Sequence, residues 1–341
     1  MIMSFNNEIT VISINAGGGV RGRNTKVNPI KTAISLGAII KKIEINSTVI
    51  AMQESLKIWN TSTSAYVETG KELAINLDLS YTSIFAPYLD SDFHTHQTKW
   101  EQESFKGYKK VQQGNSIITN INFGNWPWKQ PCTGYPGHDK KSYISTQISN
   151  ASIYSTGNRD TEPRNIVVVP LQITSNITAF FIATHLTKLT GENRNNLEDS
   201  RSKEASEIRL GQINQIFKIV KEIQCMDNYP LKSPIILAGD FNAMPGSIEI
   251  LKIEEIFQRV PLKKSESHAA SEEFNNVDHI FLNDPNNILS TNYSIKVDPH
   301  KINGITDHLP VVAKFEINEY IVERANQSFH RTATPSASLQ G

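Results

Sequence analysis

Polar residues recur where apolar segments of this chain begin or end, and their side chains are of the types that bind metals and transfer protons. They are Asn15 (ITVISIN), Glu54 (VIAMQE), His185 (AFFIATH), Asp240 and Asn242 (IILAGDFN), Asp278 (VDHIFL), and Asp307 with His308 (ITDHLPVV). Any one of them alone is more often a turn former or a helix cap. Together they predict a site, because strands that lie side by side bring their ends to one edge.

The chemistry of such a site follows from its charges. Carboxylates brought close together repel one another unless a positive group lies between them. Oxygen ligands select hard divalent cations, so Mg²⁺ is the expected occupant and Mn²⁺ or Ca²⁺ are the alternatives. Histidines beside carboxylates are suited to general acid and base work near neutral pH.

The elements that must position these residues are mostly strands. Short β-branched runs predict strands at Ile9–Asn15, Val49–Met52, Asn115–Thr119, Ile166–Ile173, Ala179–Thr184, Ile235–Ala238, Val277–Leu282 and Val311–Ile317. A helix is expected over Lys31–Ile45, and a longer one over Ala205–Ile223. In the second, Ile213, Ile216, Phe217, Val220 and Ile223 form one apolar stripe that must pack on a sheet.

Many strands with a few one-sided helices indicate an α/β fold, in which two sheets form a β-sandwich flanked by helices. We expect one domain over residues 1–320 and a disordered tail over residues 321–341, where Ser, Thr, Ala and Pro are frequent. The segments Tyr88–Gly114 and Ile121–Lys141 show no clear periodicity and are interpreted as long loops.

Composition excludes several classes of protein. Of 341 residues, 38% are hydrophobic, and no apolar run is long enough to span a membrane as a helix. The 34 Lys and Arg balance the 34 Asp and Glu, so nucleic-acid affinity would need a local basic patch. The two cysteines, Cys132 and Cys225, are interpreted as ordinary thiols. The first residues lack a secretory signal, which favours a cytoplasmic protein.

The ordered motifs around Asn15, MQES, THL, GDFN, VDHIF and TDHLPV resemble the endonuclease/exonuclease/phosphatase superfamily, to which deoxyribonuclease I belongs. The resemblance runs from about Ile9 to Ile317. It implies the four-layer α/β sandwich of deoxyribonuclease I and a metal-dependent phosphoester hydrolase site at one edge. These motifs are shared by members that cleave DNA, RNA, phosphoinositides and sphingomyelin, so they leave the substrate open.

The resemblance also implies roles for individual residues. Glu54 would be the principal metal ligand, with Asn15 and Asp307 nearby. Asp240 and Asn242 would orient the attacking water and hold a phosphate oxygen. His308 would be a general base or phosphate contact, with its tautomer fixed by Asp278, and His185 would assist the leaving oxygen. Which histidine is the base stays open.

Two further residues, Arg164 and Tyr154, are candidates for contacting substrate phosphate. Arg164 precedes an apolar strand, at a place that resembles a phosphate-binding arginine of the superfamily. The alternative is that Arg164 forms a surface salt bridge and Tyr154 is a packing residue.

Three functions are therefore carried forward. The leading hypothesis is a Mg²⁺-dependent phosphodiesterase, most simply a DNA or RNA nuclease with nucleic acid as its substrate. The second keeps the catalyst but changes the substrate to a phospholipid, a phosphoinositide or a small nucleotide. The third is a non-catalytic binding protein on the same fold.

Overall fold

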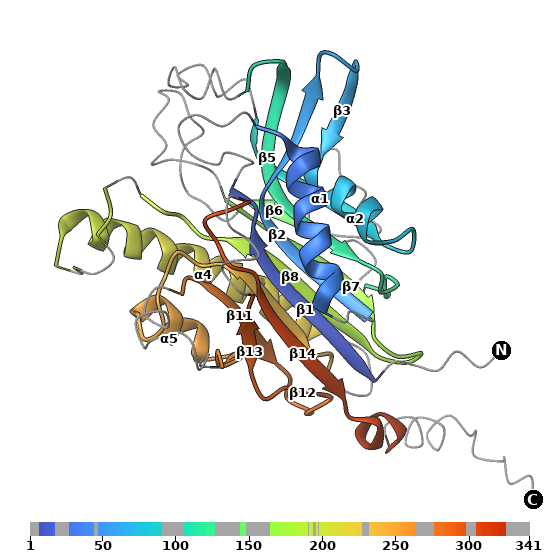
Figure 1. Cartoon of the computed structure of the whole chain (residues 1–341). Helices are drawn as coiled ribbons and strands as arrows, with labels where there is room; N and C mark the ends of the chain where they lie inside the picture. Colours follow the sequence, from blue (N-terminus) through green and yellow to red (C-terminus); the bar gives the residue numbers. More distant parts are fainter. Residues whose placement is uncertain are drawn as a thin grey trace, which may run out of the picture.

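The fold was analysed in a computed structural model of the chain. The structure describes residues 7–17, 27–43, 47–90, 105–126, 144–147, 164–189, 191–193, 196, 198–226, 232–263, 276–297 and 305–324. Within these ranges the strands form two sheets, with helices on the outside of each (Figure 1).

The first sheet contains strands from both ends of the chain, in the order β12-β14-β1-β2-β5-β4, with β13 paired to β14 and β3 paired to β2. Its strands are β1 (Glu8–Asn15), β2 (Ser47–Asn60), β3 (Ala65–Glu68), β4 (Thr82–Asp90), β5 (Tyr108–Thr119), β12 (Leu289–Ser290), β13 (Ser294–Lys296) and β14 (Val311–Ile317). β1 runs parallel to β2 and antiparallel to β14. The end of β1 therefore lies beside the segment that leads into β14.

The second sheet has the order β10-β11-β9-β8-β7-β6. Its strands are β6 (Ile144–Gln147), β7 (Asn165–Gln172), β8 (Thr178–His185), β9 (Ile235–Asp240), β10 (Gln258–Arg259) and β11 (Asp278–Asn283). β8 and β9 are parallel, and β11 is antiparallel to β9. The ends of β8 and β9 and the start of β11 consequently meet at one edge.

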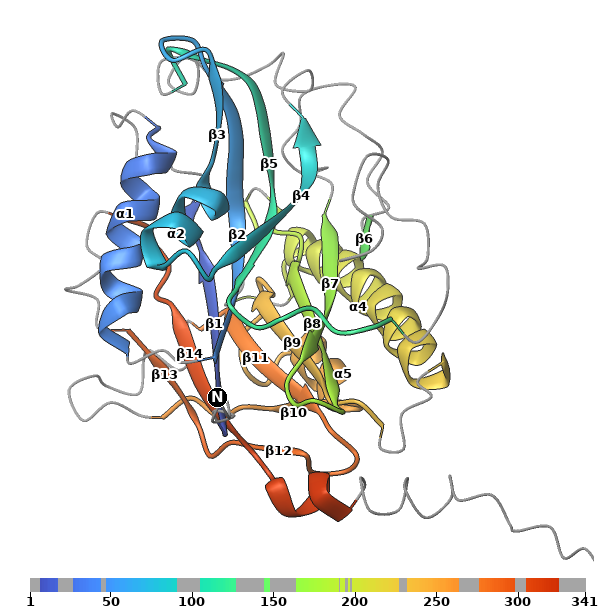
Figure 2. The same ribbon diagram turned by 90° about the vertical axis from the view of Figure 1, so that its right-hand side faces the viewer.

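Three of the apolar clusters in the described residues are layers, one between the two sheets and one between each sheet and its helices. Residues such as Val11 and Phe181 fill the layer between the sheets. Helices α1 (Pro29–Ile40) and α2 (Thr69–Leu77) cover the outer face of the first sheet, and α4 (Ser200–Met226) and α5 (Ile248–Glu254) cover that of the second (Figure 2). The predicted α/β sandwich is thus confirmed, and the stripe of α4 packs on its sheet as expected.

Several boundaries differ from the sequence-based expectation. α1 begins at Pro29, after the Asn28 side chain caps the Lys31 amide at 2.9 Å, and ends at Ile40 in a 3₁₀ turn. The segment Tyr88–Gly114, expected as a loop, contains the end of β4 and the first half of β5. Residues 319–324 are helical, past the point where the tail was expected to begin. None of the described helices is long and apolar enough to cross a membrane.

Candidate active site

The alternation of side chains along the strands brings four of the polar residues to the space between the sheets. In β1, Val11 faces the inter-sheet core, and side chains two and four residues later share that face, which gives Asn15 an inward direction. His185, Asp240 and Asp278 each lie two residues from an inward-facing residue of β8, β9 or β11, so their side chains also point between the sheets. All four are at most 4% exposed. The site is thus the end of the sandwich interior.

Glu54 reaches the same space through an irregularity in β2. Ala51 faces the inter-sheet core, so regular alternation would place Glu54 on the opposite face. The ladder between β2 and β5 shifts register between Met52 and Ser55, and Glu54 has a φ of 52°. Such a bulge redirects a side chain, and its strained backbone is typical of functional positions.

Asn15 connects the two sheets at the site. Its Nδ2 donates to Oε1 of Glu54 at 3.2 Å and to Oδ2 of Asp240 at 3.0 Å. Its Oδ1 accepts from the Gly17 amide at 2.9 Å, and the Thr306 hydroxyl donates to its carbonyl at 2.7 Å. Two carboxylates from different sheets therefore meet at one amide, which itself is held by its neighbours.

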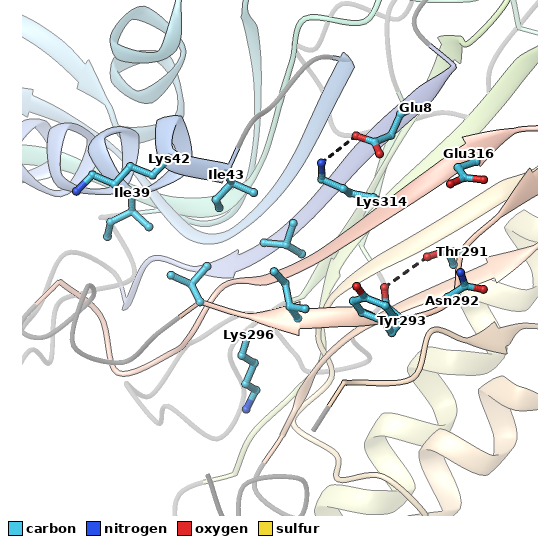
Figure 3. A pocket seen from close by; sticks show the side chains of 13 residues that line it. Glu8, Ile39, Lys42, Ile43, Thr291, Asn292, Tyr293, Lys296, Lys314 and Glu316 are labelled. Carbon is cyan, nitrogen blue, oxygen red and sulfur yellow. Dashed lines mark hydrogen bonds and ion pairs between the residues drawn. The ribbon is translucent and has the colours of Figure 1, made fainter. Parts of the chain in front are cut away.

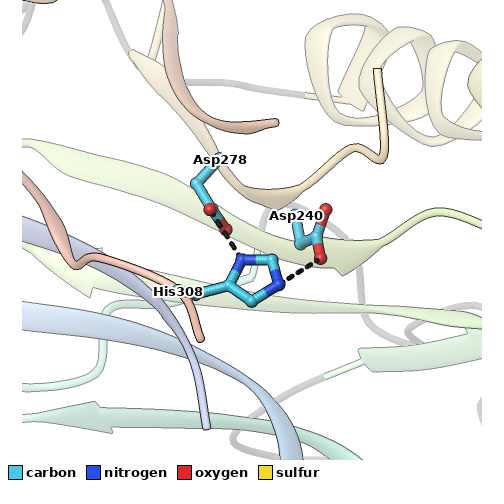
Figure 4. Close-up of side chains that lie close together, drawn as sticks. All are labelled: Asp240, Asp278 and His308. Atoms are coloured by element: carbon cyan, nitrogen blue, oxygen red, sulfur yellow. Dashed lines mark hydrogen bonds and ion pairs between the residues drawn. The ribbon is translucent and has the colours of Figure 1, made fainter. Parts of the chain in front are cut away.

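His308 lies between two carboxylates (Figure 4). Its Nδ1 is 2.8 Å from Oδ2 of Asp278, and its Nε2 is 3.7 Å from Oδ2 of Asp240. Burial acts to lower the pKa of His308, but the hydrogen bond and charge of Asp278, with the charge of Asp240, outweigh it and raise the pKa to about 10. Burial raises the pKa of Asp278 to about 6, against the effect of His308.

Asp240 and His185 form a second pairing, completed by Asn242. Nδ2 of Asn242 donates to the Leu186 carbonyl at 3.0 Å and lies 3.2 Å from Nε2 of His185, which is 3.5 Å from Oδ2 of Asp240. Asn242 has a φ of 47°, and its backbone N–H donates to Oδ1 of Asp240 at 2.8 Å. Burial, with the positive charge of Arg164, lowers the pKa of His185 to about 3, so its imidazole is neutral at pH 7.

The remaining predicted site residues have different outcomes. Asp307 is exposed, and its carboxylate lies beside Gly17, close to the end of β1. Arg164 precedes β7 and is only 3% exposed, so it is not a surface residue. Tyr154 lies outside the described residues.

The side chains fit a hard divalent cation by their chemistry. Glu54, Asp240, Asp278 and Asp307 bring four carboxylates to one end of the sandwich, opposed by the positive charges of Arg164 and His308. Oxygen-rich, negatively charged sites of this kind suit Mg²⁺, Mn²⁺ or Ca²⁺. In the described part of the chain, Asp240, Asp278 and His308 also have ligand atoms within 4.8 Å of one another.

An ion-pair network behind the site was not predicted from the sequence. Nη1 of Arg209, in α4, is 2.8 Å from Oε1 of Glu192, and its Nη2 is 2.9 Å from Oε1 of Glu249. All three side chains are at most 4% exposed. Its Nη1 also donates to the Thr187 carbonyl at 3.3 Å, so it anchors the segment that follows His185. An arginine on the polar side of a helical stripe carries no sequence signal that separates this role from a solvated one.

A cavity of about 690 Å³ lies elsewhere (Figure 3). It is lined by residues from α1, β13 and the outer side of β14, among them Ile39, Ile295 and Lys314, and by Tyr293 just before β13. Lys314 is paired with Glu8 at 3.1 Å, and none of the predicted site residues lines this cavity.

Comparison with known proteins places the fold. No protein-family profile and no curated protein sequence matches the chain. Among solved structures, an endonuclease/exonuclease/phosphatase from Beutenbergia cavernae is similar with a TM-score of 0.58 and 14% identity, covering 92% of this chain and 72% of the other. An endonuclease/exonuclease/phosphatase family protein from Leptotrichia buccalis is similar with a TM-score of 0.54 and 15% identity, covering 91% of this chain and 100% of the other.

The catalytic domain of human Nocturnin, with a bound sulfate anion, is similar with a TM-score of 0.53 and 15% identity, covering 91% of this chain and 95% of the other. The resemblance seen in the motifs is therefore matched over most of the chain by the arrangement of the sheets and helices. The chain has the fold of the endonuclease/exonuclease/phosphatase proteins, the deoxyribonuclease I-like α/β sandwich.

Proposed function

We propose that this protein is a divalent-metal-dependent phosphoester hydrolase of the endonuclease/exonuclease/phosphatase superfamily, and that its substrate is a nucleic acid. The observation that carries the proposal is the pair of carboxylates, Glu54 and Asp240, joined by the amide of Asn15 and flanked by the His308–Asp278 and His185–Asn242 pairs. The names of the similar structures support phosphoester chemistry.

Phosphoester hydrolysis requires negative charge to be stabilised on the phosphate oxygens and protons to be moved at the attacking and leaving oxygens. Glu54, with Asn15 and Asp307, would hold a Mg²⁺ ion, which when bound supplies charge stabilisation to the phosphate. The other side chains divide the remaining work.

Asp278 holds Nδ1 of His308, so Nε2 is the atom of His308 that is available for proton transfer. Asp240 is fixed by hydrogen bonds from Asn15 and from the Asn242 amide, and is placed to orient a water molecule. His185 is aligned by Asn242, and Arg164 brings a guanidinium group for the phosphate oxygens.

The proposal is tested by incubating the purified protein with single- and double-stranded DNA and RNA, in Mg²⁺, Mn²⁺ or EDTA. We expect metal-dependent cleavage that is abolished in Glu54→Gln and in His308→Ala. Glu204→Gln is the control, because Glu204 is 55% exposed on α4 and pairs only with the nearby Arg201 among the described residues.

A parallel panel of phospholipids and phosphoinositides separates the substrate from the chemistry. Hydrolysis confined to that panel would show that the catalyst is correct and the nucleic-acid substrate wrong. A folded wild type that cleaves neither panel would contradict phosphoester hydrolysis itself.

A further inference from the structure

Tyr88 is a buried aromatic residue at the site end of β4. It is 2% exposed, and it follows Ile84 and Ala86, whose side chains face the inter-sheet core. The ladder between β4 and β5 shifts register between Pro87 and Leu89, so Tyr88 is the residue at the irregularity. Alternation with Ile84 and Ala86 directs the ring into the end of the sandwich, where the polar residues gather, and the irregularity lies at the same position.

The ring of Tyr88 contacts two residues of the opposite sheet. The Cζ atom of Arg164 lies 5.2 Å from the centroid of the ring. The imidazole of His185 lies at 6.3 Å between centroids, inclined by 74° in an edge-to-face arrangement. A guanidinium over an aromatic face is attracted by the ring, and the attraction is stronger where both groups are removed from water. Arg164 and Tyr88 are 3% and 2% exposed, so this condition is met.

The backbone around Tyr88 is held by the same part of β5 that lies opposite Glu54. Gly114 pairs with Ser55 beyond the bulge of β2 and with Pro87 before the irregularity of β4. A Cβ atom at Gly114 would overlap the carbonyl of Ala86, so the close approach of β4 requires glycine there.

The opposite sheet also holds this turn of β4. Nδ2 of Asn165 donates to the Ala86 carbonyl at 3.0 Å and to the Pro87 carbonyl at 3.3 Å. Asn165 directly follows Arg164 at the start of β7. The backbones that carry Tyr88 and Arg164 are thus tied to each other, which fixes the ring relative to the guanidinium.

We propose that Tyr88 is a positioning residue of the active site, which holds the Arg164 guanidinium and the His185 imidazole in the arrangement that the phosphate requires. This inference rests on the proposed hydrolase function. An arginine side chain has many rotamers, and the aromatic face restricts it to one region before substrate binds. Because the His185 imidazole packs edge-to-face with the Tyr88 ring, the same ring aligns both the guanidinium and the imidazole.

The first test compares steady-state kinetics of Tyr88→Leu and Tyr88→Phe. Tyr88→Leu keeps an apolar side chain but removes the aromatic face, and we expect kcat/KM to fall by roughly 10- to 100-fold, as small misplacements of catalytic groups do. The loss should appear in kcat as well as in KM, because His185 is displaced together with Arg164. Tyr88→Phe keeps the ring face and should recover most of the loss.

Phe315→Leu is the matched control, since Phe315 is fully buried in the same inter-sheet core but pairs with Ile9 at the opposite end of β1. If Tyr88→Leu and Phe315→Leu lower kcat/KM equally, or if Tyr88→Phe is as impaired as Tyr88→Leu, the positioning role is wrong. If the wild type is active and Tyr88→Leu lowers kcat/KM no more than Phe315→Leu does, this inference is wrong but the proposed hydrolase function stands.

A second measurement does not depend on turnover. In a double-mutant cycle, Tyr88→Leu and Arg164→Leu should lower the unfolding midpoint together by less than the sum of the two single changes, because each removes the same contact. Nitrogen NMR of the His185 imidazole should shift in Tyr88→Leu and not in Phe315→Leu. Additive midpoints and an unchanged imidazole spectrum would refute the contact even if no substrate were found.

Discussion

Asp278 and Asp240 stand directly opposite each other in the antiparallel ladder of β11 and β9, and the imidazole of His308 lies between their carboxylates (Figure 4). Like charges at such a position destabilise a ladder unless a partner compensates them. Here the partner comes from the segment before β14, in the other sheet. The two sheets are therefore joined electrostatically at the point where the chemistry is proposed.

Asp278→Asn should reduce turnover far more than metal affinity. The amide cannot stabilise a charged imidazole, so His308 loses both its fixed orientation and its raised pKa. We expect kcat to fall by about 10²- to 10⁴-fold, the usual contribution of general acid–base catalysis. Calorimetric titration with Mg²⁺ supplies the comparison, and an equal loss of metal affinity would contradict the assignment.

Mg²⁺ should raise the unfolding midpoint of the wild type but not of Glu54→Gln. A ligand that binds only the folded state stabilises it, by about 2.7 kcal/mol at a hundredfold excess over Kd. Thermal unfolding in MgCl₂, against NaCl of equal ionic strength, measures the effect. If Glu54→Gln responds to Mg²⁺ as the wild type does, Glu54 is not a ligand.

Gly239→Ala should separate two site residues by pushing their strands apart. A Cβ atom at Gly239 would overlap the carbonyl of Thr184, one residue before His185 and beside Asp240. We expect a loss of roughly 1–3 kcal/mol in unfolding free energy, as for an overpacked core, and a fall in activity. Gly211→Ala on α4, where nothing lies within 4 Å, should instead stabilise the protein by about 0.5–1 kcal/mol. Urea unfolding of both variants provides the check.

Arg209→Met should destabilise the protein by about 3–5 kcal/mol, because Glu192 and Glu249 would be left buried without a cation. The exposed pair Lys203–Glu198 is the control, and Lys203→Met should cost far less, because water already screens that pair. Chemical denaturation distinguishes the two. Equal effects would mean that the buried network contributes no more than a surface pair.

Stability should decline as the pH falls from about 6.5 to about 4, partly because of His279. Burial lowers the pKa of His279 to about 4, below its ordinary value of 6.5, while its Nε2 donates to the Ala243 carbonyl at 3.0 Å. Across this window the unfolded chain binds the proton more readily, so acid favours unfolding. His279→Gln should lose less stability than the wild type between these pH values and show no difference in slope between pH 7 and 8. If the plots of unfolding free energy against pH are parallel for the two proteins down to pH 4, His279 does not cause the loss of stability.

The residues at regular strand ends could be predicted from the sequence because two simple rules apply to them. Alternation directs Asn15, Asp240 and Asp278 to one face, and β-branched runs mark the strands that carry them. Their convergence follows from strand ends that share an edge, so the motifs alone were sufficient.

Residues placed by irregular backbone could not be predicted from residue patterns. Alternation assigns Glu54 to the wrong face, so its position at the end of an apolar segment marked it as a candidate but could not give its direction. Tyr88 lay in a segment without periodicity, since a register shift and polar β5 residues obscure the strands there. The short elements α5, β12 and β13 were also missed, because their few residues carry too little periodic signal.

The hydrogen bond from Thr306 to the carbonyl of Asn15 spans almost the whole chain. β1 lies between β2 and β14, so one of its edges pairs with a strand that follows nearly 300 residues later in the sequence. During synthesis that edge stays open, and pairings this distant in sequence form slowly. Until β14 closes the sheet, His308 cannot meet Asp278, so the proposed site is incomplete. The proposed site is therefore assembled only when strands from distant parts of the sequence have paired.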